Sequence, residues 1–145
     1  MNNILLMLFF LPVTVFSTEK VVKTYYPNGQ LLSEISYKDG RRDGPCKYYW
    51  ESNYFWKKSK IKAKMHYKEG KQLGLYTSYY ENGQVEHQGT YKYSEQGVYS
   101  RKDGVWKTYY ENGQLRMESI LKEGVQLEWE SYDAAGNLLP IQEGC

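Results

Sequence analysis

Hydrophobic and polar side chains alternate along most of the chain in short segments, and glycine-containing turn signals separate these segments. The clearest example is residues 109–115, Tyr-Tyr-Glu-Asn-Gly-Gln-Leu, which recur almost unchanged at residues 79–85 and with a proline at residues 25–31. An Asn-Gly pair between alternating segments predicts a two-residue β-hairpin turn, because both residues tolerate the positive φ of a type I′ turn. The pattern therefore predicts a chain built from repeated hairpins.

The hairpins repeat with a basal period of 24 residues. Alignment on the second aromatic residue of each pair gives Tyr26, Trp50, Tyr80 and Tyr110, at steps of 24, 30 and 30 residues. In unit two the six extra residues lie in the connection 51–60, and in unit three they lie at the other end of the hairpin, before Gly104. A second turn signal, Lys-Asp/Glu-Gly, occurs at residues 38–40, 68–70, 102–104 and 122–124. Insertions of this kind map to loops and often carry binding specificity.

This repeat predicts an all-β fold, an antiparallel meander of about nine or ten strands in stacked β-hairpin repeats that form one elongated, twisted and curled sheet. If Asn112 and Gly113 form a two-residue turn, Tyr110 faces Leu115, and the same alternation gathers apolar residues of every unit on one concave face. The residues expected there are Tyr26, Leu31, Ile35, Tyr37, Cys46, Tyr48, Trp50, Ile61, Met65, Tyr67, Tyr76, Tyr80, Val85, Tyr91, Trp106, Tyr110, Leu115, Met117 and Leu121.

The opposite face is predicted to be mostly charged. It is expected to carry Glu34, Lys47, Lys62, Lys64, Glu86, Lys107, Arg116, Glu118 and Lys122. It would also carry the first tyrosine of every pair, at Tyr25, Tyr49, Tyr79 and Tyr109. Two interpretations are open. The tyrosines pack on neighbouring aliphatic stems, as Tyr109 would beside Arg116, or they form an aromatic recognition strip for a partner.

The repeat resembles a known family. Residues 104–115 read Gly-Val-Trp-Lys-Thr-Tyr-Tyr-Glu-Asn-Gly-Gln-Leu, and the likeness to the MORN-repeat variant extends over about residues 24–139. The resemblance implies a single β-repeat domain over residues 18–145, with departures at the two insertions and in the last unit. It also implies a function, because bacterial members are often described as antitoxin-like or immunity-like, and other MORN proteins are linked to membranes and scaffolding.

The N-terminus predicts export. An apolar run at residues 4–16 is too short to span a bilayer, and it fits the core of a signal peptide, residues 1–17, that is cleaved after Ser17. The expected location is periplasmic or secreted; a buried first strand is the alternative. The 19 basic and 17 acidic residues of the chain provide no concentrated basic face, so no nucleic-acid partner is expected.

The sequence gives little basis for catalysis. His66 and His87 lie in different units and, in the expected register, on opposite faces, so we expect no metal site, no cofactor and no enzymatic activity. Cys46 and Cys145 are candidates for a disulfide in an exported protein, and a buried free Cys46 is the competing interpretation.

The first insertion holds the most distinctive segment, Tyr54, Phe55, Trp56, Lys57 and Lys58. Consecutive aromatics cannot all face one core, so they either cap the sheet edge or anchor a partner, and aromatics beside lysines also suit a membrane interface.

We expect an exported protein-binding module, of the immunity or antitoxin type, that neutralises a toxic effector enzyme in the periplasm. The alternative is a membrane-surface or envelope-scaffold module that uses this aromatic-basic loop; the oligomeric state is left open.

Overall fold

A computed structural model describes residues 17–52, 59–94, 97 and 99–140 of the chain. In this part every regular element is a β-strand. The strands are β1 (Glu19–Tyr25), β2 (Leu31–Lys38), β3 (Arg41–Tyr49), β4 (Ile61–Lys68), β5 (Lys71–Gln72), β6 (Gly74–Tyr79), β7 (Val85–Tyr93), β8 (Ser100–Tyr109), β9 (Leu115–Lys122) and β10 (Val125–Ser131). Residues 1–16 of the predicted signal peptide, the segment at residues 54–58 and Cys145 lie outside the described residues.

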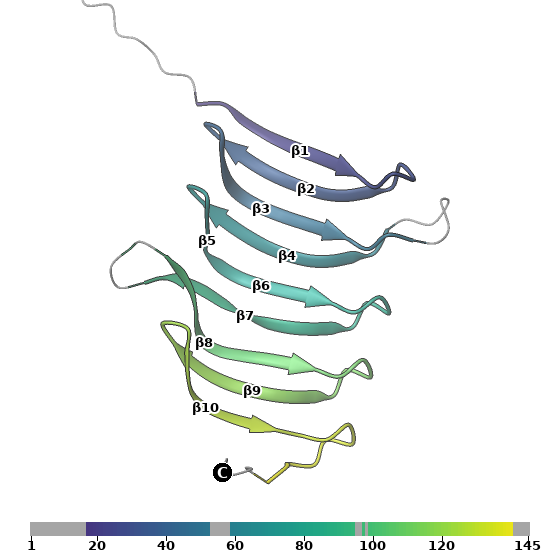
Figure 1. Ribbon diagram of the computed structural model, residues 1–145, viewed down its shortest axis with the longest axis vertical. Helices are drawn as coiled ribbons and strands as arrows, with labels where there is room; N and C mark the ends of the chain where they lie inside the picture. Colours follow the sequence, from purple (N-terminus) through teal and green to yellow (C-terminus); the bar gives the residue numbers. More distant parts are fainter. Residues whose placement is uncertain (1–16, 53–58, 95–96, 98, 141–145) are drawn as a thin grey trace, which may run out of the picture.

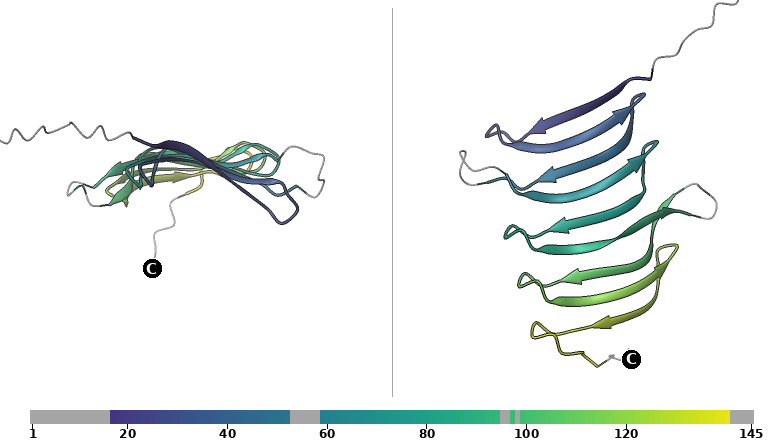
Figure 2. Two further views of the ribbon diagram at one scale, coloured as in Figure 1. Left: turned by 90° about the horizontal axis from the view of Figure 1, so that it is seen from above. Right: turned by 180° about the vertical axis from the view of Figure 1, so that it is seen from behind.

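The strands form one open antiparallel sheet in which each strand lies beside the next in the chain, from β1 to β10 (Figure 1). The two-residue strand β5 pairs with β4 beside this path. Seen from above, the sheet is a single twisted layer (Figure 2). The predicted all-β meander of stacked hairpins is therefore confirmed. The two long connections, after β3 and after β7, leave from opposite sides of the sheet, as the positions of the insertions predicted.

Two kinds of turn connect the strands. On the side that we call the turn edge, Asp39-Gly40, Glu69-Gly70 and Glu123-Gly124 all have positive φ at both residues, which defines the tight type I′ geometry. The sequence prediction had assigned this geometry to Asn-Gly instead. The prediction of a turn at residues 102–104 was wrong: Asp103 and Gly104 lie inside β8, where Gly104 has φ of +76° beside an irregularity in the β7–β8 pairing.

The Asn-Gly segments form three-residue loops at the opposite side, the loop edge. Tyr110 N donates to Gln114 O and Gly113 N donates to Tyr110 O, so Glu111, Asn112 and Gly113 form the loop and Gly113 alone takes the left-handed conformation. This is a type I turn completed by a bulge, and the same bonds occur at Tyr26 and Tyr80. The two-residue turn predicted for Asn112-Gly113 was wrong.

A second irregularity restores the predicted register. Tyr109, rather than Tyr110, pairs with Leu115, and the pairing then shifts so that Thr108 opposes Met117 and Trp106 opposes Ser119. The three-residue loop shifts the pairing by one residue relative to a two-residue turn. The extra residue at the bulge shifts it back, so the rest of the two strands has the predicted register. Leu115 therefore lies beside the first tyrosine, and the same holds for Leu31, Ile61 and Val85, which pair with Tyr25, Tyr49 and Tyr79.

The core of this single layer is thin. Among the described residues the buried apolar side chains are Ile35, Cys46, Tyr49, Ala63 and Trp106. Trp106 stacks on Tyr76 with ring centres 5.8 Å apart and meets Tyr91 edge-on at 5.2 Å. The indole also covers Gly89, where any side chain would occupy the same space. This aromatic cluster is the main packing centre of the middle of the sheet.

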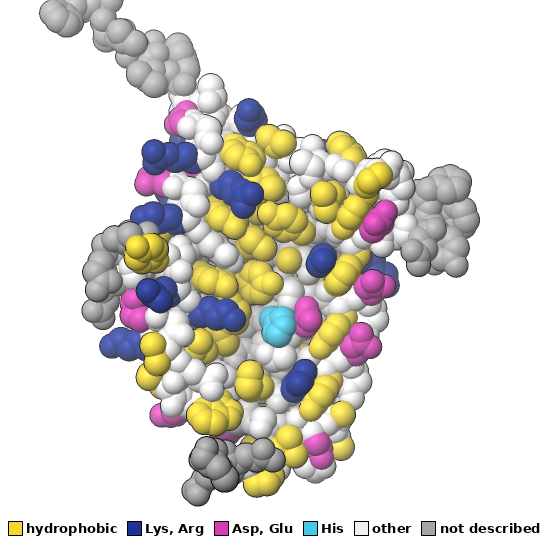
Figure 3. All heavy atoms as spheres, viewed as in Figure 1, with side chains coloured by type: hydrophobic (Ala, Val, Ile, Leu, Met, Phe, Trp, Pro, Cys, Tyr) yellow, Lys and Arg dark blue, Asp and Glu magenta, His cyan; other side chains and the backbone are white. Residues whose placement is uncertain are grey.

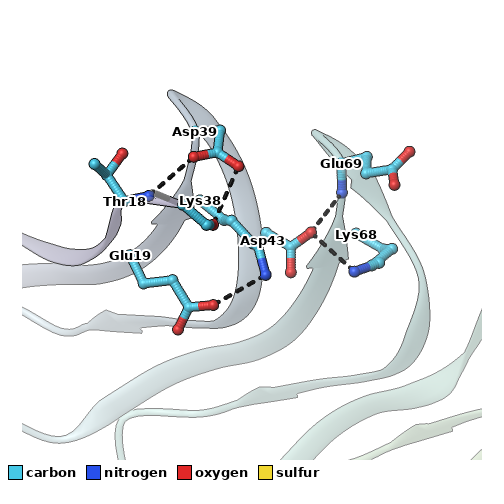
Figure 4. Close-up of polar contacts among 8 residues, drawn as sticks. Thr18, Glu19, Lys38, Asp39, Asp43, Lys68 and Glu69 are labelled. Carbon is cyan, nitrogen blue, oxygen red and sulfur yellow. Dashed lines mark hydrogen bonds and ion pairs between the residues drawn. The ribbon is translucent and has the colours of Figure 1, made fainter. Parts of the chain in front are cut away.

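At the turn edge, polar side chains hold successive hairpins together. Asp39 accepts a 2.9 Å bond from Thr18 N, and Asp43 accepts a 3.1 Å bond from Glu69 N and an ion pair from Lys68 (Figure 4). The Glu69 N–H, followed by Lys68, lowers the pKa of Asp43. Asp103 repeats the contact with Glu123 N. These carboxylates are engaged by the chain itself, so we assign them a structural role.

At the loop edge, the second aromatic residue of each pair reaches across to the next unit. The Tyr26 hydroxyl donates to Tyr49 O at 2.8 Å, Trp50 Nε1 to Tyr79 O at 3.1 Å, Tyr80 to Tyr109 O at 2.8 Å and Tyr110 to Tyr132 O at 2.9 Å. The loop asparagines add a parallel row, since Asn82 donates to Glu111 O and Asn112 to Ala134 O. The repeated Tyr-Tyr-x-Asn-Gly sequence therefore binds each unit to the next.

Replacing Tyr80 by phenylalanine should lower the free energy of unfolding by about 1 kcal/mol, because it leaves the Tyr109 carbonyl without that donor. Urea denaturation followed by circular dichroism measures the effect. Tyr99→Phe is the matched control, since its ring is exposed and it should change stability by less than about 0.5 kcal/mol. Equal stability of the two variants would contradict the role assigned to this hydrogen bond.

Candidate binding site

The first tyrosines of the pairs, predicted to bind a partner, differ in their surroundings. Tyr49 is only 8% exposed and its hydroxyl donates a 2.6 Å bond to Glu34. Burial and this bond raise the pKa of Tyr49 to about 12. Tyr79 lies under the ammonium of Lys64, Tyr109 is half-buried, and Tyr25 is exposed. The four rings therefore do not form a uniformly exposed strip, and Tyr49 packs within the protein.

The other face combines aromatic rings with cations, and we call it the aromatic–cationic face. Strand pairing places Cys46 beside Ile35 and Met65 on it, and places His87 beside Ser78 and Thr108. Four cations cover aromatic rings here: Lys62 over Trp50 and Lys102 over Trp106, both at 4.2 Å, Arg42 over Tyr67 at 5.3 Å and Arg116 over Tyr110 at 5.5 Å. Each distance is within the range of a cation–π interaction.

The prediction of Arg116 beside Tyr109 on the charged face was wrong, and so were the predictions for Lys62 and for Glu86, which accepts a bond from Ser78 on the aromatic–cationic face. The bulge explains all three errors. Arg116 is the extra residue between Leu115 and Met117, and Lys62 occupies the same position in unit two, between Ile61 and Ala63. Extra residues at a bulge leave the strict alternation of a strand, so their side chains can join the opposite face.

The four cations of the aromatic–cationic face contact aromatic rings rather than carboxylates. Within the described residues, none of Arg42, Lys62, Lys102 and Arg116 has a carboxylate oxygen within 4.0 Å. On the opposite face Lys23 pairs with Glu34 and Lys107 with Glu118, whereas Lys47 and Lys64 also have no ion pair among the described residues. A space-filling view shows the basic side chains spread among hydrophobic ones (Figure 3). This face therefore has positive charge and aromatic surface available for a partner.

One end of this face is hollowed. Side chains from β7 to β10 and the following turn surround a space of about 480 Å³, lined by His87, Thr108, Tyr110, Arg116, Met117, Ser131, Tyr132 and Leu139. His87 Nδ1 lies 3.1 Å from the Thr108 hydroxyl and His87 Nε2 lies 3.7 Å from Glu86. The hollow is lined by the Arg116 guanidinium, by hydroxyl groups and by apolar side chains, so it suits a side chain of a protein partner.

The described residues contain no group of three or more His, Cys, Asp and Glu side chains that could hold a metal ion. His66 pairs with Pro45 and His87 with Ser78, which places the two imidazoles on opposite faces, as predicted.

Cys46 is a fully buried free thiol, and burial raises its pKa. Its predicted pairing with Cys145 stays a prediction. No helix in the described ranges is long and apolar enough to cross a membrane.

The fold and the repeated loop bonds define an open, single-sheet β-repeat protein. The family model described as MORN repeat variant matches residues 18–39, 72–93 and 102–123, so the chain contains MORN-type repeats. Such repeats are generally protein- or membrane-binding modules. Searches of curated proteins and of solved structures gave no match.

Proposed function

We propose that this protein is an exported binding protein of the immunity or antitoxin type, which neutralises a toxic effector enzyme in the periplasm by direct contact. The observation that supports binding most directly is the aromatic–cationic face, where Arg42, Lys62, Lys102 and Arg116 have no carboxylate partner in the described part of the chain. Aromatic residues and arginine are enriched where protein interfaces are strongest. The apolar run at residues 4–16 supports export. The family resemblance supports the immunity type.

The partner would present carboxylates and apolar groups to this face. Such a surface would find cations that are already held in place over aromatic rings, so little side-chain freedom would be lost on binding. Opposite charges would also speed the encounter and disfavour basic competitors. The active-site surroundings of an enzyme that acts on cationic substrates would have this character.

The test is capture of the partner from the source cells with tagged full-length protein, followed by mass spectrometry. We expect one protein partner, and we expect Lys62→Glu/Arg116→Glu to reduce its recovery at least tenfold, since two charge-reversed contacts cost more than about 1.4 kcal/mol. Lys47→Glu/Lys64→Glu is the matched control: it makes the same charge change on the opposite face, where Lys64 also covers a tyrosine.

Recovery of no stable protein partner would overturn the proposal. Equal losses of partner recovery in the two double variants would show that the partner does not bind through the aromatic–cationic face. Export is tested separately by the mass of the protein recovered from the periplasm. We expect a chain that begins at Thr18. A protein found only in the cytoplasm with its N-terminus intact would contradict export but not binding.

A second candidate function is binding to a membrane surface. Trp50 and Tyr110 beneath Lys62 and Arg116 are the observation that favours it, because aromatic rings and cations together suit the headgroup region. Sedimentation with liposomes of anionic lipid tests this function. Binding that is lost in Lys62→Glu/Arg116→Glu would support it, and binding lost only when residues 54–56 are changed to serine would assign it to the insertion. No binding would exclude it.

A further inference from the structure

The described sheet has two open edges, β1 and β10, and each exposes a row of backbone groups (Figure 1). An open edge is a template for a further strand unless charged residues, proline or a bulge protect it. The carbonyl of Ser131 accepts a 2.8 Å bond from Leu139 N, so the returning chain covers the end of β10. The edge from Val125 to Glu130 has no such partner among the described residues.

β10 is an unusually apolar edge. Val125, Leu127 and Trp129 are 62%, 55% and 45% exposed, and they alternate with polar residues along one short strand. β10 contains no lysine or arginine, the residues that most often protect an edge, and its charged residues are Glu128 and Glu130. Its protection consists of these two glutamates and of an irregularity in the pairing with β9 at Leu127.

The other open edge, β1, is also apolar but carries the opposite charge. It carries Lys20 and Lys23 against one acidic residue, Glu19, and it exposes the apolar side chains of Val21 and Tyr25. Lys23 pairs with Glu34 but its side chain is still about half exposed. A basic and apolar strand therefore bounds one end of the sheet, and an acidic and apolar strand bounds the other.

We propose that β10 binds β1 of a second copy of this chain, so that copies associate head to tail and continue the sheet. Backbone hydrogen bonds between the two edges supply affinity, as in strand addition to other open sheets. The charges decide the partner strand: β1 brings Lys23 to the sheet face that carries Glu128 and Glu130, whereas a second β10 would oppose them with the same charge. This inference is independent of the proposed function.

The association is weak and reversible. A single pair of seven-residue strands buries less area than the roughly 1,200 Å² of the smallest stable interfaces. The contact is also heterologous, so a dimer still has one free β1 and one free β10 edge, and longer assemblies grow with concentration. We therefore expect monomers in dilute solution and a distribution of oligomers in concentrated solution.

Sedimentation velocity of the full chain over a wide concentration range tests the proposal. The wild type should show a sedimentation coefficient that rises with concentration. Leu127→Lys, which places a lysine on the open edge, should abolish the rise. Leu75→Lys is the matched control: Leu75 is 57% exposed but lies on β6 inside the sheet, so this variant should associate like the wild type.

Charge exchange identifies the partner strand. Glu128→Lys/Glu130→Lys and Lys20→Glu/Lys23→Glu should each be monomeric alone, because each makes the two edges alike in charge. An equimolar mixture should associate again, since the basic β10 of one meets the acidic β1 of the other. Circular dichroism checks that both are folded. A wild type that stays monomeric, association that survives Leu127→Lys, or a mixture that stays monomeric would each overturn the proposal.

Discussion

Gly89→Ala is expected to lower the free energy of unfolding by about 3 kcal/mol, the largest loss from any single added methyl group in the described sheet. A Cβ at Gly89 would overlap the indole of Trp106, and this indole is itself fixed against Tyr76 and Tyr91. Since Gly89 does not have a positive φ, the cost is steric rather than conformational. Urea denaturation measures it.

Two variants separate these causes. Gly83→Ala adds the same methyl where nothing lies within 4 Å, but φ there is +95°, so we expect a loss of about 1 kcal/mol from backbone strain alone. In Gly89→Ala/Trp106→Ala the methyl enters the space left by the indole, so the double variant should lose less than the sum of the single losses. Additive losses, or a Gly89→Ala protein as stable as the wild type, would contradict the packing described.

Tyr49→Phe is expected to cost about 2 kcal/mol at neutral pH, because it removes a 2.6 Å hydrogen bond from a buried hydroxyl to the charged Glu34. Tyr109→Phe is the matched control: it is the same change at the same repeat position in another unit. Stability of Tyr49→Phe equal to that of Tyr109→Phe would contradict a special role for the Tyr49 hydroxyl.

The same pair predicts a pH dependence. The pKa of Tyr49 is raised to about 12 in the folded protein, so its contribution is complete below the ordinary tyrosine pKa of 10.0 and is lost as pH rises through about 12. The pKa of Glu34 is lowered by the Tyr49 hydroxyl and then by Lys23, so its contribution is present above its ordinary pKa of 4.5 and is lost on acidification. The stability difference between wild type and Tyr49→Phe should therefore shrink at both extremes. A difference that is constant with pH would contradict the bond.

The strand order and the register of the strand bodies could be predicted from the sequence because a sheet of repeats is specified many times over. Any slip that exposed Trp106 would also expose the equivalent aromatic residues of the other units. The same agreement across units gave the positions of the two insertions. Redundancy of this kind makes a repeat fold easier to predict than a fold in which every contact occurs once.

The residues at the loop edge could not be placed, because the Asn-Gly pair is compatible with two hairpin geometries that differ by one residue. Pro27 was the available signal, since proline favours the second position of a type I turn. The compensating bulge leaves no pattern of its own: its extra residue is Leu32, Lys62, Glu86 or Arg116 in successive units. Lys62 and Arg116 were therefore assigned to the opposite face.

The row of loop bonds has a consequence for how such proteins change in length. Each loop offers a tyrosine or tryptophan donor to the unit that follows and a carbonyl acceptor to the unit that precedes it. A unit inserted between two others would find both partners already in place, and removal of a unit would leave matching groups to rejoin. Gene duplication or loss of one 24-residue unit would thus shift the spacing of surface charges by a fixed step without a new core, so the binding surface can lengthen or shorten in evolution by whole repeats.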